Sequence, residues 1–122
     1  MYTKLEKDKL ISGEEARLSR IYKNLSKDKM ALSIGLIQRL AFLRISMQEL
    51  ETDLNENGYT EKFSQGDQEP YDRKRPNADI YVSFYANYLK TTKQLADMQP
   101  KAEVKANVSD GFDEFISGRD EI

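Results

Sequence analysis

The fold is decided by residues 36–58, which read LIQRLAFLRISMQELETDLNENG. Large apolar side chains recur there at alternating intervals of four and three residues, the spacing that forms the seam of a coiled coil or helical bundle. The stripe consists of Leu36, Leu40, Leu43, Met47, Leu50 and Leu54. We therefore expect one long helix whose stripe packs the core of a bundle and an oligomer interface.

This helix is expected to begin near Met30 or Ala31 and to end at Asn57-Gly58, because glycine just past the last turn is a common helix stop. A helix of about 26 residues is about 39 Å long. The helix predicted before it is too short to cover a stripe of that length. The long helix therefore needs a further partner, either a third helix or another subunit.

A shorter helix is expected before it, over about residues 13–25. Ser12 and Glu15 have the spacing of a capping box, and a short turn at 26–29 follows. Residues 1–11 are expected to form a loose helix or to stay disordered. The apolar stripe of this first helix consists of Leu18, Ile21, Tyr22 and Leu25.

After the long helix, a polar stretch runs from Tyr59 to Arg75, and residues 65–67 (Gln-Gly-Asp) are able to turn a small β-hairpin. Pro76 suits the first turn of a third helix, which is expected to reach Met98. The aromatic residues of this helix have two interpretations: they stack nucleic-acid bases, or they pack the core or an interface. The helical spacing favours packing for Tyr81, Phe84 and Tyr88.

These elements predict an all-α fold: a helical hairpin or bundle with a long central helix, and an extended loop or small β-hairpin between helices. Residues 1–100 are expected to form one helical DNA-binding and oligomerisation domain, and residues 101–122 a partly disordered acidic tail. Within that tail, Phe112, Phe115 and Ile116 stand at i, i+3 and i+4 among acidic residues. Such a peptide becomes helical in a partner's groove, or it docks back on its own subunit.

The composition argues against an enzyme. The chain has no Cys and no His, so it lacks disulfides, the commonest general base and the commonest metal ligand. The sequence contains no glycine-rich phosphate loop and no loop with calcium-site spacing. We expect no catalytic residues, no metal and no cofactor. We expect no apolar run to reach the length of a bilayer span, and therefore a soluble, cytosolic protein with no membrane contact.

Positive charge is concentrated in the first half of the chain. Residues 1–50 contain ten Lys/Arg and six Asp/Glu, whereas residues 51–122 contain nine and fifteen. Two groups of cations are candidates for contacts with DNA phosphates, although both groups are also compatible with an ordinary solvated surface. They are Arg17, Arg20, Lys23, Lys27 and Lys29 in the first group, and Arg73, Lys74 and Arg75 in the second.

Several short motifs occur in a specific order. A helix continues through residues 49–58 (ELETDLNENG), and a polar, partly extended stretch ends in residues 75–77 (RPN). A further helix carries residues 93–95 (KQL) and closes at residues 98–100 (MQP). In this order of elements, residues 14–100 resemble the small terminase subunits of tailed bacteriophages, with the Pro and Asn of the helix start in the reverse order.

The resemblance implies a non-enzymatic DNA-packaging component in the cytoplasm of the infected bacterial host. Such subunits form ring-shaped homo-oligomers, bind double-stranded viral DNA and regulate the terminase large subunit, which has the ATPase and nuclease. In that role the three apolar tail residues would engage the large subunit. The alternative is a helical oligomeric interaction or regulatory protein with no nucleic-acid role, which would share the apolar seam and the docking peptide.

Overall fold

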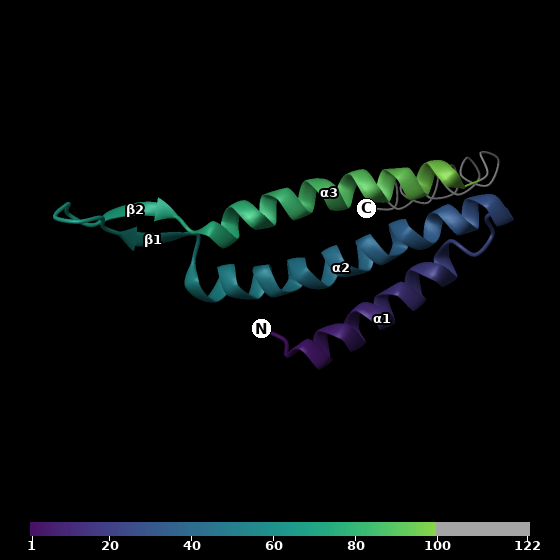
Figure 1. Ribbon diagram of the computed structural model, residues 1–122, viewed down its shortest axis with the longest axis horizontal. Helices are drawn as coiled ribbons and strands as arrows, with labels where there is room; N and C mark the ends of the chain where they lie inside the picture. The colour runs from purple at the N-terminus through teal and green to yellow at the C-terminus, as the bar shows by residue number, and fades with distance from the viewer. Residues whose placement is uncertain (100–122) are drawn as a thin grey trace, which may run out of the picture.

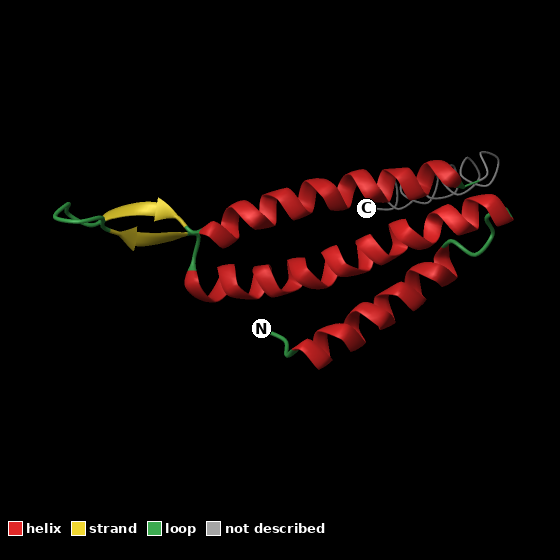
Figure 2. Ribbon diagram, viewed as in Figure 1, coloured by secondary structure: helices red, strands yellow, loops and turns green. Residues whose placement is uncertain are grey.

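The computed structural model describes residues 1–99. In chain order its elements are α1 (Lys4–Ile21), α2 (Lys27–Asn57), β1 (Thr60–Phe63), β2 (Tyr71–Lys74) and α3 (Pro76–Met98). α2 lies in the middle, with α1 and α3 packed against it (Figure 1). Figure 2 shows the two strands projecting past the end of the helices. The predicted mostly helical fold is confirmed, whereas the predicted tail lies outside the described residues.

The first helix begins earlier than the sequence predicted. The Thr3 hydroxyl accepts a hydrogen bond from the backbone N–H of Glu6 (3.2 Å), and the Glu6 carboxylate accepts one from the backbone N–H of Thr3 (3.4 Å). This capping box starts α1 at Lys4 and leaves Ser12 inside the helix, which ends at Ile21. The expected start near residue 13 was wrong because two capping boxes have the required spacing, and the chain uses the earlier one.

The ends of α2 are set by two local signals. The Ser26 hydroxyl accepts a hydrogen bond from the backbone N–H of Lys29 (3.4 Å), so the predicted turn at 26–29 is instead the cap and first turn of this helix. At the other end Gly58 has a φ of 81°, and its N–H donates to the Leu54 carbonyl at 2.8 Å. Glycine adopts a positive φ without steric cost. The predicted end of the long helix is confirmed.

The segment between α2 and α3 forms a small hairpin, one of the two alternatives that the sequence left open. β1 and β2 pair antiparallel, from Thr60 opposite Lys74 to Phe63 opposite Tyr71. Gly66 lies in the connection with a φ of 61°, and the rings of Phe63 and Tyr71 meet edge to face with centroids 5.8 Å apart. Pro76 occupies the first turn of α3 as expected. The hairpin therefore joins two antiparallel helices.

The predicted apolar stripe is covered within one chain. Leu36 is partly buried, and the other five members are buried: Leu40, Leu43, Met47, Leu50 and Leu54. The core cluster includes Leu18 from α1, Leu40 from α2 and Leu95 from α3. Of the two partners that the stripe required, the third helix of the same chain is therefore the one observed.

A buried carboxylate fastens α1 to α2. The Glu14 side chain is only 6% exposed and is paired with Arg17 of its own helix and with Arg44 of α2, whose Nε lies 3.0 Å from Oε2. The hydrogen bond to Glu14 raises the pKa of Arg17. A buried carboxylate is costly unless it is paired, so these two arginines make the burial of Glu14 tolerable.

α2 is apolar and long enough to cross a bilayer by length and composition, contrary to the sequence expectation. Of its most apolar 18-residue window, 44% is buried inside the subunit. The central helix of a soluble protein meets the same criterion. The packing of α1 and α3 against α2 explains why this helix carries so many apolar side chains.

The core makes a direct stability prediction. Leu95 is fully buried where α3 meets the other helices, so Leu95→Ala should lower the free energy of unfolding by about 2–5 kcal/mol. The matched control is Leu5→Ala on α1, where the side chain is 67% exposed; it should change that free energy by less than about 0.5 kcal/mol. Urea unfolding followed by circular dichroism gives both values. Equal losses would contradict the core as described.

Candidate nucleic-acid interface

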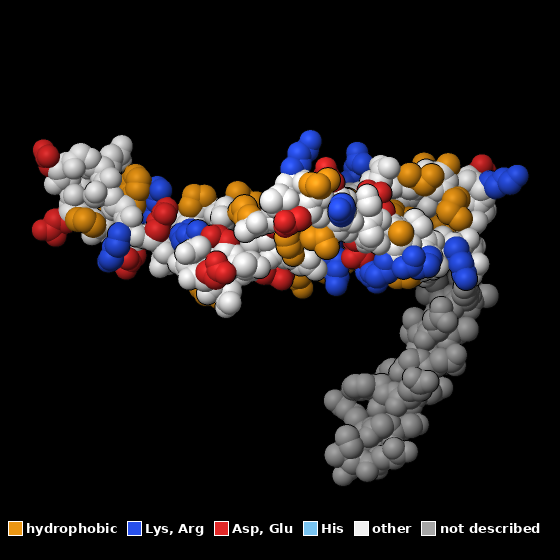
Figure 3. All heavy atoms as spheres, turned by 90° about the horizontal axis from the view of Figure 1, so that it is seen from below, with side chains coloured by type: hydrophobic (Ala, Val, Ile, Leu, Met, Phe, Trp, Pro, Cys, Tyr) orange, Lys and Arg blue, Asp and Glu red, His pale blue; other side chains and the backbone are white. Residues whose placement is uncertain are grey.

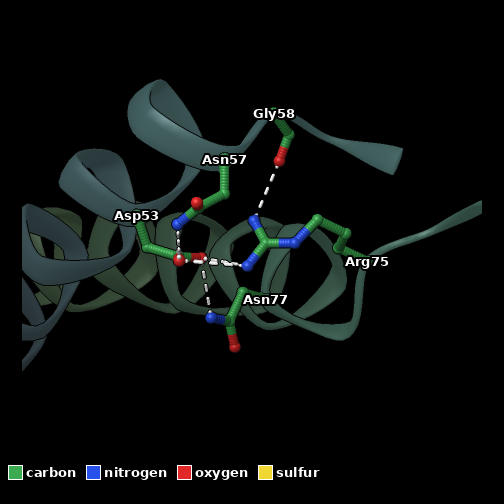
Figure 4. A network of polar contacts seen from close by, with 5 residues as sticks. All are labelled: Asp53, Asn57, Gly58, Arg75 and Asn77. Atoms are coloured by element: carbon green, nitrogen blue, oxygen red, sulfur yellow. Dashed lines mark hydrogen bonds and ion pairs between the residues drawn. The ribbon is translucent and has the colours of Figure 1, made fainter. Parts of the chain in front are cut away.

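The second group of candidate cations is engaged in the fold. Arg75 lies at the base of the hairpin with its side chain 17% exposed. Its Nη1 donates to the Gly58 carbonyl at 2.9 Å, and its Nη2 reaches both Asp53 oxygens, at 3.0 Å and 2.9 Å (Figure 4). Its backbone N–H also donates to the Tyr59 carbonyl at 2.9 Å. Arg75 therefore joins the end of α2 to the start of α3 and is poorly placed to contact DNA.

Two amides complete this arrangement around the Asp53 carboxylate. Asn57 Nδ2 donates to Oδ1 and Asn77 Nδ2 donates to Oδ2, each at 2.8 Å. Figure 4 shows Asn57 and Asp53 on α2 and Asn77 at the start of α3, with their side chains converging. We call Asp53, Asn57, Gly58, Arg75 and Asn77 the Asp53 clamp. Its role is to set where the chain leaves α2 and where it returns as α3.

The clamp stabilises the charged form of Asp53. The hydrogen bond from Arg75, followed by those from Asn77 and Asn57, holds the pKa of Asp53 well below its usual range, and the same pair raises the pKa of Arg75. Accepting several hydrogen bonds is a recognised cause of a low carboxyl pKa. Both groups therefore stay charged over the whole physiological pH range.

The other two cations of this group are paired on the hairpin surface. Arg73 Nε lies 2.8 Å from Glu61 Oε1, and the Arg73 guanidinium lies 3.7 Å from the centroid of the Phe63 ring. Lys74 Nζ lies 3.2 Å from Asp79 Oδ1, with the Lys74 side chain 65% exposed. An exposed pair of this kind is weak, so Lys74 remains available to an anion more readily than Arg73 or Arg75.

Most cations of the first candidate group have no ion-pair partner among residues 1–99. Arg17 is paired with Glu14, but the side chains of the other four make no ion pair or hydrogen bond with any residue from 1 to 99. All four are exposed and lie at the end of α1, in the following turn and in the first turn of α2. We call this set the basic corner: Arg20, Lys23, Lys27 and Lys29.

The electrostatics of the basic corner favour an anion. Asp28 is the one acidic residue between positions 18 and 30. The first turn of α2 adds its unsatisfied backbone N–H groups and the positive end of the helix dipole. Figure 3 shows Lys and Arg side chains gathered toward the end of the molecule opposite the hairpin, where α1 meets α2. The arrangement is able to contact phosphates without reading bases.

Three aromatic residues of α3, Tyr81, Phe84 and Tyr88, contact α2 or the core, as expected for packing rather than base stacking. The Tyr81 hydroxyl donates to Glu51 Oε2 at 2.9 Å, a bond that raises the pKa of Tyr81. The rings of Phe84 and Phe42 have centroids 6.3 Å apart, and Tyr88 packs against the core cluster. Each of these three α3 residues remains partly exposed.

The acidic side chains of residues 1–99 do not gather into a metal site. No group of three or more Asp, Glu, Cys or His in this part of the chain is placed to hold a metal ion. The tail residues predicted to dock to a partner, Phe112, Phe115 and Ile116, lie outside the described residues. The structure thus reduces the candidate cations to the basic corner, with Lys74 as an exposed outlier.

The Asp53 clamp should make the stability of the fold decrease at acidic pH. Above about pH 5 Asp53 is charged in both the folded and the unfolded chain, so the full stabilisation is present. Below that pH Asp53 becomes protonated in the unfolded chain but stays ionised in the folded chain, because folding lowers its pKa. Stability is therefore lost as the pH falls toward the folded pKa. Asp53→Asn should lower the urea midpoint at pH 7 and flatten its decline below about pH 4.

The matched control is Asp72→Asn. Asp72 pairs with Lys62 at 3.0 Å, but both side chains are exposed by more than half. This variant should keep both the wild-type midpoint at pH 7 and the wild-type acid dependence. If Asp53→Asn had the same urea midpoint as Asp72→Asn at pH 7 and below about pH 4, the clamp would have no energetic role.

The chain was compared with protein-family models, with curated proteins and with solved structures, and none of the three comparisons gave a match.

Proposed function

We propose that this protein is a non-enzymatic DNA-packaging adaptor of the kind formed by the small terminase subunits of tailed bacteriophages. In this role it binds double-stranded viral DNA, assembles with copies of itself and regulates the large subunit that carries the ATPase and nuclease. The observation that carries the proposal is the basic corner, where four exposed cations lie together without a carboxylate partner among residues 1–99.

The basic corner suits the backbone of a duplex. Lys27 and Lys29 stand in the first turn of α2, where the helix dipole reinforces the attraction of a phosphate. Arg20 and Lys23 approach from the end of α1. None of these side chains has to break an ion pair within residues 1–99 before it binds. Contacts of this kind give affinity and a strong salt dependence, with little preference for base sequence.

Self-assembly has a candidate surface on α3. Ala78, Val82, Tyr85 and Leu89 recur at intervals of four, three and four residues, which places them on one stripe of the helix. Val82 is 66%, Tyr85 48% and Leu89 52% exposed. This stripe replaces the α2 stripe as the proposed contact between copies, because the α2 stripe is already covered. A ring would bring many basic corners to one DNA, which compensates for the net charge of -2 per chain.

The remaining parts of the proposal concern the large subunit. The hairpin projects from the helices (Figure 1), and it presents Tyr59 and Tyr71, which are 69% and 48% exposed. The hairpin would form one part of the surface offered to that subunit. Phe112, Phe115 and Ile116 of the tail would form another part, in chains where they are not docked on their own subunit.

A helical interaction or regulatory protein with no nucleic-acid role is the second candidate. The observation that favours it is the pairing of Arg17, Arg73 and Arg75 within the fold. These three side chains are already paired with carboxylates of the fold, so they do not need DNA as a partner. The two candidates differ in one measurable property, which is affinity for a duplex.

Charge reversal in the basic corner tests DNA binding. If all four cations contact phosphates, the logarithm of the binding constant should fall with the logarithm of salt concentration with a slope of about -3.6 per subunit. Arg20→Glu combined with Lys23→Glu should weaken binding about tenfold or more and reduce that slope by about 2. Fluorescence anisotropy with a labelled duplex at several salt concentrations measures both quantities.

The matched control combines Lys4→Glu with Lys9→Glu. Both lysines are exposed on the same helix, and the pair changes the net charge by the same amount at the other end of α1. This control should bind nearly as the wild type does. If both double variants bound DNA equally weakly, net charge rather than the basic corner would explain the loss. If the wild-type protein did not bind duplex DNA, the second candidate function would be favoured.

Two charges on the α3 stripe test self-assembly. Val82→Glu with Leu89→Glu places carboxylates where copies would meet, and burying a charge without a partner is costly. The mass found by light scattering should therefore fall to that of one chain. Ser83→Glu with Asn87→Glu is the control, because both residues are exposed on α3 away from the stripe. A wild-type protein of single-chain mass at all concentrations would contradict the assembly.

A further inference from the structure

An apolar groove lies at the end of the molecule where α3 stops. It has a volume of about 410 Å³ and is lined by Leu32 and Leu36 of α2 and by Gln94, Asp97 and Met98 of α3. Leu32 is 66% exposed. No residue from 1 to 99 fills this groove. It is separate from the α3 stripe and from the Asp53 clamp.

We propose that this groove is the docking site of the chain's own segment 109–116, which reads SDGFDEFI. The segment supplies the apolar side chains that the groove lacks, because Phe112, Phe115 and Ile116 share one face when the segment is helical. An amphipathic helix in a hydrophobic groove is a recurring mode of recognition. The inference does not depend on DNA binding.

Charge complementarity selects this segment. It carries Asp110, Asp113 and Glu114 and no Lys or Arg. Lys29 lies one turn before Leu32 on the same face of α2, and Lys90 and Lys93 lie one turn before Gln94 and Asp97 on α3. The side chains of these three lysines are exposed and make no ion pair within residues 1–99. Asp97 is the acidic residue of the groove itself, so the lysines at its rim are the partners for the carboxylates of the segment.

The position of the groove favours docking within one chain. Met98 lines the groove, and residues 100–111 connect it to Phe112. Twelve residues span up to about 40 Å, which is ample for a return to a groove beside their own start. A short connection of this kind gives an effective concentration in the millimolar range. Even a weak interaction is therefore enough to occupy the groove.

The absence of Cys allows a clean test on the full chain. A Ser117→Cys variant takes a nitroxide spin label at one position, next to the docking segment. The chain is also labelled with ¹³C in its four Met methyl groups. Met98 reports on the groove, and Met1 is the reference because it lies beside Ile80, near the opposite end of α3. We expect the label to weaken the Met98 signal and to leave the Met1 signal unchanged.

Two further variants separate docking from mere proximity. Phe112→Ala with Phe115→Ala removes the apolar anchors of the segment. Leu32→Glu places a carboxylate in the groove, at a position whose side chain is 66% exposed in the fold. Each should restore most of the lost Met98 signal. The control, Val104→Ala with Val108→Ala, removes apolar residues that precede the segment and should leave the Met98 signal as weak as in the parent.

Two results would overturn the proposal. If the Met98 signal were equally weak with and without the two phenylalanines, the segment would not occupy the groove. If a spin-labelled chain weakened Met98 only in a second, ¹³C-labelled chain mixed with it, the groove would hold the segment of another copy. The measurement contains no DNA, so neither result decides whether the basic corner binds a duplex.

Discussion

α2 is apolar over a wider part of its circumference than one neighbouring helix covers, and this constraint organises the molecule. Ile37, Ala41 and Ile45 are buried alongside the stripe that runs from Leu40 to Leu54. Each fully buried Leu or Ile contributes about 1.5–3 kcal/mol, whereas an exposed ion pair contributes about 0–1 kcal/mol. Burial of α2 therefore drives the packing of α1 and α3. The Glu14 pairs and the Asp53 clamp then fix where those helices begin and cross.

The charges follow from the same packing. Once α1 lies on α2, Arg17 meets Glu14, and once α3 returns along α2, Arg75 meets Asp53. The turn between α1 and α2 lies at the end of the helices (Figure 1). No carboxylate among residues 1–99 forms an ion pair with Lys23 or Lys27 there. Of the two groups of candidate cations, the basic corner is thus the part whose charges folding leaves without an ion pair among residues 1–99. The proposed function rests on that remainder rather than on the total charge of the chain.

Much of the fold could be predicted from local signals. The period of the apolar residues gave the long helix, Gly58 its end, residues 65–67 the hairpin, and Pro76 the start of α3. The start of α1 was missed because residues 4–11 have no clear stripe and are largely exposed, so the capping box at Thr3 was the one available signal. The site was less predictable. Arg75 stands 22 residues from Asp53, and no local pattern indicates which arginine of residues 73–75 becomes buried.

Hydrogen exchange of the full chain with and without duplex DNA, followed by mass spectrometry, tests the central claim most directly. The account predicts that residues 37–54 exchange most slowly in both states, because they lie at the centre of the packed helices. It also predicts that DNA slows amide exchange in residues 20–29 and leaves the exchange rate of the hairpin at residues 60–74 unchanged. Protection gained only in the hairpin, or fast exchange across residues 37–54, would contradict it.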